Sequence, residues 1–521
     1  MALICVSIAA SDVLGLVRAA RAAKRGGADL VEARLDHLAR CGPEDLVRLR
    51  KRVNFIPVVA TLRPAREGGR YRGSERLRTE LLERAVECGF DYVDVELGTG
   101  KARLASLLEL CRRRGVKSIV SRHELRGTPG VARMVRMMVR CASAGDLGKV
   151  AVAARSAGDT LRIIRAMRKA RSQVPNFIAM GMGPAGRLTR TLGPFLGSAV
   201  VYAGLDRRRT TAAGQPDLES LGQLLGILKK ASGSTQLYGL LGHPLGHSLS
   251  PAMHNAAFGA LGLDAAYIPF DVGPGGLKGA FAALREAGLV GANVTIPHKQ
   301  RIIPLLDGLD GAARSIGAVN TIVGRNGKMV GHNTDARGFV DALKEAHIGL
   351  EGAVAVVLGA GGAARAAVHG LLEEGALVTV FNRTAGRARE LPDALGAPKI
   401  IVAGLPDLRR AVGGADILVN CTPVGMKGFS RGSPVPGRWL RRGLAVMDMV
   451  YNPVRTPLLL MAERRGARTV SGMEMFLRQG RESLRLWTGE TLSVKVLEDA
   501  LGVLRNHKTG IKYPMMNDKG R

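Results

Sequence analysis

The chain carries a lysine and a histidine whose types and positions suit chemistry on a ketone. Lys149 stands at the head of an apolar run that continues to Ala154. Burial disfavours an ammonium, and the neutral amine that remains attacks ketones to form an imine. His123 follows another apolar run and is able to move protons at the carbon beside such an imine. Each residue also has an ordinary interpretation: a lysine at the solvated end of a strand, and a structural histidine.

A second group of polar side chains suits proton transfer at an alcohol. Asn293 and Thr295 alternate along a predicted strand and therefore share one face, and Lys299 follows just beyond it. Asn320 and Asp335 come later in the chain. A lysine–aspartate pair beside a nicotinamide moves the alcohol proton while hydride leaves carbon. The alternative is a buried salt bridge.

Two serines project from a predicted tight turn between a strand and a helix. Ser248 and Ser250 lie in the segment Leu241-Gly-His-Pro-Leu-Gly-His-Ser-Leu-Ser-Pro251. Two hydroxyls placed in this way could clamp a carboxylate. Alternatively, Ser250 is a helix N-cap followed by proline at the first helical position. Both interpretations can hold, because a capped helix N-terminus also attracts anions.

A glycine-rich turn predicts dinucleotide binding. Leu358-Gly-Ala-Gly-Gly-Ala-Ala-Arg365 joins a predicted strand, 354–358, to an alanine-rich helix, and the next strand, 377–381, is followed by Asn382-Arg383-Thr384. The glycines let the backbone approach a pyrophosphate at a helix N-terminus. An acidic residue at the end of the second strand usually binds the ribose of NAD; Arg383 suits a 2′-phosphate, so we predict NADP. The predicted cofactor contacts are Gly359, Ala360, Gly361, Gly362, Ala363, Asn382, Arg383 and Thr384.

The first 225 residues must position the first pair of residues. Short apolar runs alternate there with amphipathic helical stretches, and we predict strands at 3–8, 30–35, 56–62, 92–97, 118–121, 149–153, 177–182 and 199–203. Eight such repeats favour a (β/α)8 barrel, whose active site lies at the C-terminal ends of the strands.

The whole chain is predicted to be α/β. The predicted parts are the barrel at 1–225, a polar linker at 226–236, a second α/β domain at 237–335, a Rossmann dinucleotide-binding domain at 336–472, helices returning to the preceding domain at 473–505, and a tail at 506–521.

Polar segments at the predicted strand ends carry a resemblance to a known family. Glu32-Ala-Arg-Leu-Asp36, Ser121-Arg-His-Glu124, Gly148-Lys149-Val-Ala and Arg187-Leu-Thr-Arg190 with Phe195-Leu-Gly-Ser198 occur in this order. They resemble type I 3-dehydroquinate dehydratase, a (β/α)8 barrel that works through a lysine imine. The resemblance implies that Lys149 forms a Schiff base with the C3 ketone of 3-dehydroquinate. It implies that His123 removes the C2 proton and assists loss of the C1 hydroxyl.

The same resemblance implies a set of substrate contacts. They are Glu32, Arg34, Arg63, Arg190, Thr211 and Gln215. A guanidinium binds a carboxylate bidentately, so Arg190 is the expected carboxylate partner. From the residues alone, Glu32 with Arg34 is equally well an ordinary ion pair lining a barrel.

The motifs after residue 237 together resemble shikimate dehydrogenase. The resemblance implies that Lys299 and Asp335 are the catalytic pair. The implied substrate contacts are Ser248, Ser250, Asn293, Thr295, Asn320, Tyr451 and Gln479. The residues implied near the nicotinamide or the substrate are Thr422, Met449, Gly472 and Met475. Both serines are present, which favours shikimate over quinate.

Together, the two resemblances predict a bifunctional enzyme that converts 3-dehydroquinate to 3-dehydroshikimate and then, with NADPH, to shikimate. A rival interpretation keeps an NADP-dependent shikimate or quinate dehydrogenase and makes the barrel an inactive scaffold. This rival interpretation rests on the segment Thr211-Ala-Ala-Gly-Gln215, where the dehydratase family usually has Ser-Ala-Pro-Gly-Gln. His332-Asn-Thr-Asp335-Ala336 likewise departs from the dehydrogenase pattern Asp-Asn-Thr-Asp-Gly, but it keeps the catalytic carboxylate.

Bulk composition bounds the remaining possibilities. The net charge of +32 suggests nucleic-acid binding, but the basic residues are spread through the chain and aromatics are only 4%. Six scattered cysteines form no C-x-x-C pair, so we expect no metal. No apolar run reaches membrane-span length, and the N-terminus enters a strand at once without a signal peptide, so we expect a cytoplasmic protein. The expected partners are small-molecule substrates, not nucleic acid or membrane, and the oligomeric state is left open.

Overall fold

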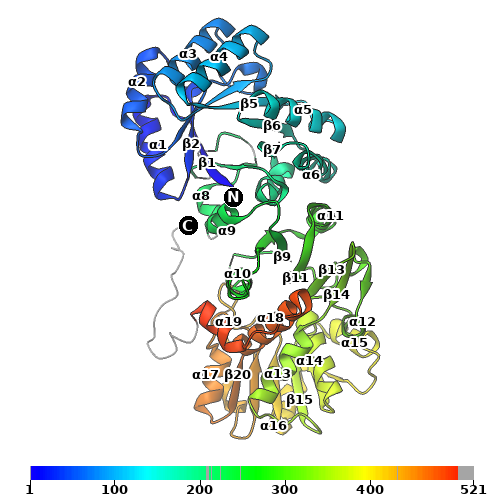
Figure 1. Cartoon of the computed structure of the whole chain (residues 1–521). Helices are drawn as coiled ribbons and strands as arrows, with labels where there is room; N and C mark the ends of the chain where they lie inside the picture. Colours follow the sequence, from blue (N-terminus) through cyan, green and yellow to red (C-terminus); the bar gives the residue numbers. More distant parts are fainter. Residues whose placement is uncertain are drawn as a thin grey trace. The chain divides into compact units, whose positions relative to one another are not determined.

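The computed structural model describes residues 2–206, 210–212, 214–222, 224–246, 248–430 and 432–502. They form two compact units (Figure 1). The first comprises Met1–Gln236 with Gly279–Gly288, and the second Leu237–Lys278 with the chain from Leu289. Both units are α/β, as predicted. The predicted tail at 506–521 lies outside the described residues.

The first unit is a nearly closed parallel barrel. Its eight-stranded sheet has the order β7-β6-β5-β4-β3-β2-β1-β8, and one bridge between Phe177 and Ser198 links the two end strands. The strands are β1 (Leu3–Ile8), β2 (Leu30–Arg34), β3 (Val58–Thr61), β4 (Tyr92–Glu96), β5 (Lys117–Glu124), β6 (Leu147–Ala153), β7 (Phe177–Met182) and β8 (Val200–Ala203). The predicted (β/α)8 class is therefore confirmed.

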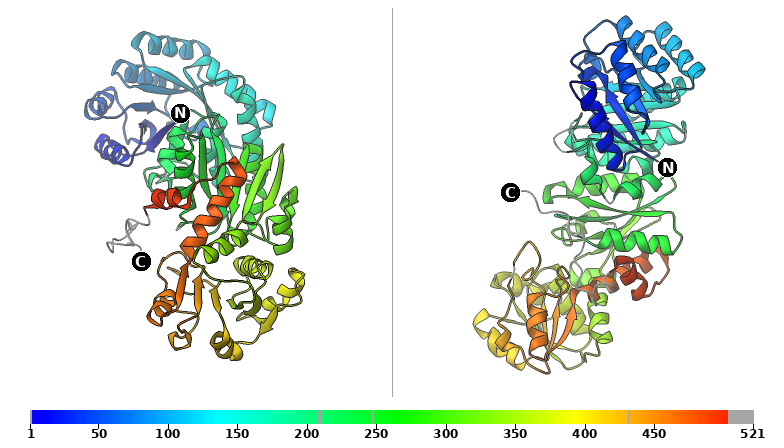
Figure 2. Two further views of the ribbon diagram at one scale, coloured as in Figure 1. Left: turned by 60° about the horizontal axis from the view of Figure 1, so that its bottom comes forward. Right: turned by 90° about the vertical axis from the view of Figure 1, so that its left-hand side faces the viewer.

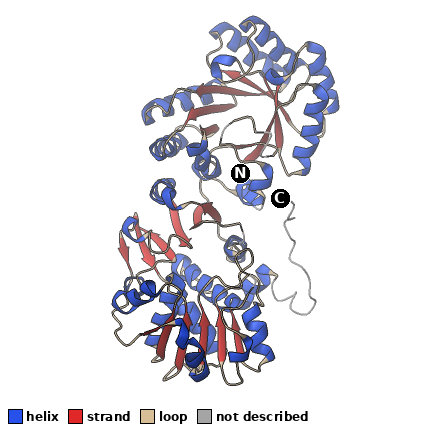
Figure 3. Cartoon of the chain, turned by 180° about the vertical axis from the view of Figure 1, so that it is seen from behind, coloured by secondary structure: helices blue, strands red, loops and turns tan. Residues whose placement is uncertain are grey.

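Helices alternate with these strands and cover the outside of the sheet (Figure 3). They are α1 (Val13–Arg25), α2 (Pro43–Arg52), α3 (Glu75–Glu87), α4 (Lys101–Arg114), α5 (Val131–Ala144), α6 (Ala157–Arg171), α7 (Arg187–Leu192), α8 (Leu218–Leu221) and α9 (Leu224–Lys230). α1 shows why such stretches fold: Asp12 caps its first turn, and Leu16, Ala20 and Ala23 bury one face.

Alternation along the strands decides which side chains enter the barrel. Cys5, Leu30, Ala151 and Tyr202 belong to one buried interior cluster. Because successive side chains point to opposite faces, Glu32 and Lys149 share the inward face with Leu30 and Ala151. Two charged residues of the predicted site are thus carried inside by the same pattern that fills the core.

The predicted linker at 226–236 is partly helical. α9 runs from Leu224 to Lys230, and Leu228 and Ala231 are buried. The polar composition of residues 229–236 suggested a flexible segment, but apolar side chains at helical spacing just before it give that part a face to bury. The expectation of a flexible segment therefore does not extend to residues 226–230, and the linker itself stays a prediction.

The second unit contains two six-stranded sheets. The first has the order β10-β9-β11-β13-β14-β12 and mixes parallel and antiparallel pairs. Its strands are β9 (Gln236–Gly242), β10 (Ala265–Asp271), β11 (Leu289–Val294), β12 (Gly308–Leu309), β13 (Thr321–Arg325) and β14 (Lys328–His332). The helices of this part are α10 (Ser250–Ala260), α11 (Leu277–Ala287), α12 (Gly311–Ile316) and α13 (Asp335–Glu345).

The second sheet is entirely parallel, in the order β17-β16-β15-β18-β19-β20. Chain order 3-2-1-4-5-6 is that of the dinucleotide-binding fold. Its strands are β15 (Val354–Leu358), β16 (Leu377–Phe381), β17 (Ile401–Ala403), β18 (Ile417–Asn420), β19 (Ala445–Asp448) and β20 (Arg468–Ser471). Its helices are α14 (Gly362–Glu373), α15 (Ala385–Ala394), α16 (Leu408–Gly414) and α17 (Pro457–Arg464). The predicted Rossmann class is confirmed.

Two last helices, α18 (Gly472–Thr488) and α19 (Val494–Leu501), return from the second sheet to the first (Figure 2). Met473, Phe476 and Leu497 pack in one cluster with Tyr238 of β9 and Phe258 of α10. α18 also contacts α13, the helix that begins at Asp335. The exact limits predicted for the parts of this unit stay predictions.

Candidate active sites

Lys149 lies inside the barrel between two carboxylates. Its Nζ is 3.0 Å from Glu32 Oε1 and 3.0 Å from Asp94 Oδ2, and it stands 3.9 Å from the ring centroid of Tyr202. The residue is only 4% exposed. The alternative of a solvated strand end is therefore excluded. Two carboxylates thus compensate the buried amine, a pairing that the apolar run around Lys149 does not reveal.

A second cation shares Asp94 with the lysine. Arg63 Nη2 donates to Asp94 Oδ2 at 2.7 Å, and its Nη1 donates to Glu96 and to Ser121. Burial alone would raise the pKa of Asp94, but Arg63 and Lys149 hold it well below its usual value. Burial likewise opposes ionisation of Glu32, and the charges of Lys149 and Arg34 nevertheless lower its pKa. Charge compensation thus keeps these carboxylates ionised out of water.

His123 is held by one carboxylate at two points. Glu67 Oε2 accepts from the His123 backbone N–H at 2.9 Å and lies 3.1 Å from Nδ1. Burial, followed by the charges of Arg63 and Lys149, holds the pKa of His123 well below 6.5. The imidazole is therefore neutral near pH 7, and the contact to Glu67 fixes its orientation. Such a histidine is suited to act as a general base.

Arg190 is a buried guanidinium left free for an anion. It lies on α7 after β7, and its Nε has no partner among the described residues. Its Nη1 lies 3.0 Å from Met180 Sδ. Burial lowers the pKa of Arg190 to about 10. An uncompensated buried cation is costly, and a carboxylate that binds there would remove the cost.

The other predicted contacts are arranged in two pairs. Arg34 donates twice to Asp36, at 2.9 and 2.8 Å, so the alternative of a direct Glu32–Arg34 ion pair is wrong. Arg34 pairs with Asp36 instead of Glu32 because the Asp36 carboxylate, two residues further along the chain, accepts both guanidinium hydrogen bonds. Thr211 donates from its N–H and its hydroxyl to Gln215 Oε1, at 3.0 and 3.2 Å. Ala213, which replaces the family proline, lies outside the described residues.

A pocket of about 530 Å³ opens at the C-terminal ends of β6 and β7. Its lining includes Ala153, Met182 and Gly183, which end or follow these strands. This is the end of the barrel at which sites of this fold lie.

Several barrel residues that contact the predicted site were not in the predicted set, among them Glu67, Asp94, Glu96 and Tyr202. Asp94 and Glu96 alternate along β4 and so could have been placed on the inward face. Glu67 lies in a short turn after β3, and Tyr202 resembles an ordinary core residue, so the sequence offered no comparable signal.

In the second unit, the predicted lysine and aspartate meet. Lys299 Nζ donates to Asp335 Oδ2 in a short contact, and Asn320 Nδ2 donates to Asp335 Oδ1 at 2.8 Å. The side chain of Lys299 is 18% exposed, so solvent reaches it. The pair lies beside the glycine turn, because a Cβ added at Gly362 would meet Lys299 Cδ at 3.4 Å. The Lys299–Asp335 pair and the glycine turn are thus adjacent.

A buried polar network continues from this pair. Asn320 Oδ1 accepts from the Thr334 N–H at 2.7 Å, and Asn320 Nδ2 lies 3.4 Å from Gln479 Oε1. Ser483 of α18 accepts from Asn293 Nδ2 at 3.0 Å and donates to the Gln479 carbonyl at 2.9 Å. The network therefore joins three predicted substrate contacts to Thr334, the residue before Asp335.

The paired serines have tyrosine neighbours. Burial raises the pKa of Tyr451, partly offset by a hydrogen bond with Ser248. Burial raises the pKa of Tyr267 strongly, again partly offset by a hydrogen bond, here with Ser250. Tyr267 also donates to Asn293 Oδ1 at 2.8 Å. Thr295 follows directly after β11, half-buried.

The alternative of Ser250 as a capping residue is wrong. α10 begins at Ser250 itself, and the preceding Leu249 makes no side-chain cap. The Ser250 hydroxyl is turned to Tyr267 instead of to the helix amides. The serine is therefore available on the site side.

The dinucleotide turn fits a bound pyrophosphate. Gly359 has a φ of 114°, which favours glycine, and an added Cβ there would approach the Cys421 backbone at 3.2 Å. Gly361 precedes α14 without a side-chain cap, which leaves the helix N–H groups to an anion. Arg383 is exposed just after β16, while Asn382 Nδ2 donates to the Thr384 carbonyl. Ala360 and Ala363 are half-buried within this turn.

Predicted nicotinamide neighbours cluster beyond β18 and β19. Asn420 Oδ1 accepts from the Thr422 hydroxyl at 2.7 Å, and the Asn420 carbonyl accepts from the Met449 N–H. Gly472 approaches this loop closely, since a Cβ there would lie 2.6 Å from the Met449 backbone. Met475, one turn further on α18, is buried. The loop and the start of α18 thus form one wall.

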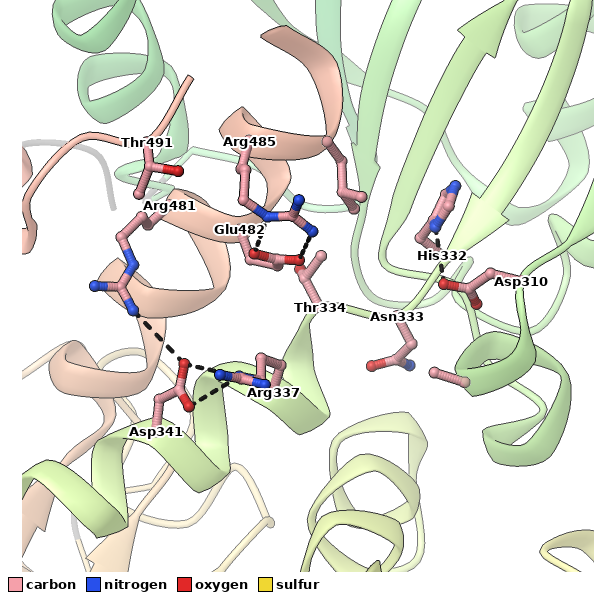
Figure 4. A pocket seen from close by; sticks show the side chains of 12 residues that line it. Asp310, His332, Asn333, Thr334, Arg337, Asp341, Arg481, Glu482, Arg485 and Thr491 are labelled. Carbon is pink, nitrogen blue, oxygen red and sulfur yellow. Dashed lines mark hydrogen bonds and ion pairs between the residues drawn. The ribbon is translucent and has the colours of Figure 1, made fainter. Parts of the chain in front are cut away.

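A pocket of about 800 Å³ lies beside this site (Figure 4). Asn333 and Thr334 line it, but neither Lys299 nor Asp335 does. Its guanidiniums are paired with carboxylates: Arg337 with Asp341, and Arg485 with Glu482 at 2.6 Å. Arg481 also lies 3.6 Å from Asp341, so each guanidinium of the described lining already has a carboxylate partner.

Over the described ranges, no helix is long and apolar enough to cross a bilayer. Within the same ranges, no cluster of three histidine, cysteine, aspartate or glutamate side chains is arranged to hold a metal ion.

Models of four protein families match the chain in succession. Type I 3-dehydroquinase matches residues 4–232, and the shikimate dehydrogenase substrate binding domain matches residues 240–322. Shikimate / quinate 5-dehydrogenase matches residues 342–427, and the shikimate 5'-dehydrogenase C-terminal domain matches residues 472–501.

Individual relatives repeat this division. The chloroplastic bifunctional 3-dehydroquinate dehydratase/shikimate dehydrogenase of Arabidopsis thaliana is 35% identical over 504 residues, which cover 94% of this chain and 82% of that protein. The shikimate dehydrogenase (NADP(+)) of Methanothermobacter thermautotrophicus is 48% identical over 276 residues, or 52% of this chain and 97% of the relative. That of Moorella thermoacetica is 48% identical over 274 residues, or 51% and 93%.

Proposed function

Because the chain belongs to the family of bifunctional 3-dehydroquinate dehydratase/shikimate dehydrogenases, we propose that each of its two reactions depends on one lysine. The chain dehydrates 3-dehydroquinate to 3-dehydroshikimate, and it reduces that product to shikimate with NADPH. Lys149 serves the first reaction and Lys299 the second. The observation that carries the proposal is the burial of Lys149 between Glu32 and Asp94, beside the neutral His123.

In the barrel, the Lys149 amine adds to the C3 carbonyl carbon and the carbonyl oxygen leaves as water. Hydrogen bonds from Nζ to Glu32 and Asp94, both at 3.0 Å, orient the amine for this attack. His123 then takes the C2 proton, and the electron pair of that bond moves toward the imine nitrogen. His123 returns a proton to the C1 hydroxyl, which leaves as water. A second water hydrolyses the imine and frees the amine.

Arg190 supplies the carboxylate site for this substrate. Among the described barrel residues no carboxylate pairs with its buried guanidinium, whereas Arg34 and Arg63 already bind protein carboxylates. We therefore assign the substrate carboxylate to Arg190 and the hydroxyl contacts to Glu32, Thr211 and Gln215.

In the second unit, Lys299 donates a proton to the ketone oxygen of 3-dehydroshikimate. When bound, NADPH supplies the hydride to the ketone carbon. Asp335 orients Lys299, and Asn320 orients Asp335. The partial exposure of Lys299 lets solvent restore its proton. Ser248 and Ser250 would bind the substrate carboxylate, which favours shikimate over quinate.

The cofactor residues are those of the turn and of the end of β16. The free amides at the start of α14 would bind the pyrophosphate, and Arg383 would bind the 2′-phosphate. Thr422, Met449 and Gly472 would lie against the nicotinamide.

Reductive trapping tests the proposal. Wild-type enzyme is treated with borohydride in the presence of 3-dehydroquinate, and the adduct is mapped by mass spectrometry. We expect a stable adduct on the peptide containing Lys149, and none in Lys149→Ala, which keeps its dehydrogenase activity. Lys117→Ala is the matched control, because Lys117 is an exposed strand lysine near a tyrosine ring. An adduct on another residue, or no adduct, would refute the imine mechanism.

A cytoplasmic location and the absence of a nucleic-acid partner stay predictions. Cell fractionation tests the first, and filter binding at physiological salt tests the second, because non-specific binding to nucleic acid collapses with salt.

A further inference from the structure

We propose that Arg78, on the helix outside the barrel, is a positioning residue for the dehydratase reaction. Arg78 acts on Lys149 through a row of side chains whose charges alternate in sign. The row runs Arg78, Glu96, Arg63, Asp94 and Lys149. The inference rests on the proposed role of Lys149 and adds a residue that does not touch the substrate.

Arg78 is fully buried, at 0% exposure, although it belongs to the outer helix α3. Its Nη2 donates to Thr99 Oγ1 at 2.7 Å and to Glu75 Oε1 at 2.5 Å. Its Nη1 faces Glu96 Oε2 at 2.5 Å, in ion-pair contact without hydrogen-bond angles. The guanidinium thus joins α3 to the end of β4.

Glu96 transmits the position of Arg78 to the inside of the barrel. One carboxylate oxygen faces Arg78, and the other accepts from Arg63 Nη1 at 2.5 Å. Arg63 in turn donates to the same Asp94 oxygen that accepts from Lys149. Glu96, Asp94 and Lys149 are all nearly inaccessible to solvent, so water cannot replace a lost partner.

Loss of Arg78 would leave Glu96 buried with Arg63 as its sole cation in this row. Removal of one partner of a buried pair leaves an uncompensated charge, which is strongly unfavourable. Glu96 then either takes up a proton or draws Arg63 toward itself and away from Asp94. The first response weakens the contact between Glu96 and Arg63, and the second weakens the contact between Arg63 and Asp94. Either way Asp94, the carboxylate that orients Lys149, loses the position that Arg63 gives it. Misplacement of a reacting group by about 1 Å costs on the order of 100-fold in rate.

The test compares Arg78→Met, Glu96→Gln and the double variant in the full-length enzyme. Arg78→Met is expected to lower the dehydratase kcat and the borohydride trapping rate about 10- to 100-fold, with KM for 3-dehydroquinate nearly unchanged. The double variant removes the uncompensated charge as well and is expected to recover much of the trapping rate. Arg84→Met is the matched control, because Arg84 lies on the same helix and is exposed.

The outcomes separate this inference from the proposed function. Absence of a Lys149 adduct in the wild type overturns the proposed function. A wild-type adduct with equally fast trapping in Arg78→Met overturns the role of Arg78. Trapping that is slowed equally in Arg78→Met and in the double variant also overturns this role, because a purely packing role of Arg78 predicts no recovery. If Arg78→Met does not fold, Arg78→Lys decides: a lower kcat at constant KM supports the inference, and wild-type kinetics refutes it.

Discussion

Replacement of Asp448 by asparagine is expected to stabilise the second unit at neutral pH. Asp448 ends β19 and is fully buried. Its Oδ1 accepts from Asn420 Nδ2 at 2.9 Å and from the Val450 N–H at 3.0 Å, and its Oδ2 accepts from the Thr456 hydroxyl at 2.6 Å. These three neutral donors do not fully replace water. Burial, only partly offset by these bonds, raises the pKa of Asp448 to about 6.

The sign and the size of the effect follow from that pKa. The folded state binds the Asp448 proton more tightly than the unfolded chain, whose reference value is 3.8. Its contribution to stability is therefore fully present below pH 3.8 and is lost as the pH rises through about 6. A difference of about 2 pKa units corresponds to roughly 3 kcal/mol. Asparagine mimics the protonated acid at every pH, although the Thr456 proton then needs another acceptor.

Tryptophan fluorescence makes this measurable, because the chain has two tryptophans and both, Trp439 and Trp487, lie in the second unit. Denaturant unfolding at pH 8 should show Asp448→Asn more stable than wild type by up to about 3 kcal/mol, and the gap should narrow toward pH 4. Asp407→Asn is the control: it removes the same charge from an exposed site. A gap that is independent of pH, or equal in the control, would refute the reasoning.

Four further results are expected. Arg383→Ala should lower kcat/KM about 10- to 100-fold for NADP+ and little for NAD+, because a charge-assisted hydrogen bond is lost; an equal loss for both cofactors contradicts this. Ser483→Ala should raise KM for shikimate about fivefold in steady-state assays, as Asn293 loses one hydrogen bond. Arg190→Lys should raise KM for 3-dehydroquinate at least about tenfold without changing dehydrogenase kinetics, because a bidentate contact is lost. Because burial holds the pKa of His123 well below 6.5, the acid limb of the dehydratase kcat/KM profile should lie below pH 6.5, and a limb centred higher would contradict the assignment.

Strand positions were predictable because their signal is local. The predicted strands 3–8, 177–182, 354–358 and 377–381 coincide with β1, β7, β15 and β16. A buried parallel strand is a continuous apolar run between polar segments, and such a run can be read without knowledge of its partners. The strand 118–121 was predicted too short, because β5 continues through Arg122 and His123, whose polar side chains end the apolar run.

Side-chain partnerships were less predictable, because they depend on which strands become neighbours. Asp36 and not Glu32 binds Arg34, and Asp94 reaches Lys149 from a strand 55 residues away in the chain. Alternation along a strand predicts which face of the sheet a residue occupies. It does not predict which residue of another strand will face it across the barrel. The alternation of Asp94 with Glu96 was the signal that could have identified Asp94. No signal in the sequence pointed to Arg78, because an arginine on a helix usually faces solvent.

The surroundings of the two lysines differ in the way that the tasks proposed for them require. Lys149 is enclosed by Glu32, Asp94 and the Tyr202 ring, and its side chain is 5% exposed. The side chain of Lys299 is 18% exposed and has Asp335 as its carboxylate partner. An amine that bonds to carbon forms an imine that free water would hydrolyse before dehydration, so enclosure protects the intermediate. An amine that only delivers a proton must recover one in each turnover, so contact with solvent serves it. On the roles proposed for the two lysines, exchange of their environments would impair both reactions.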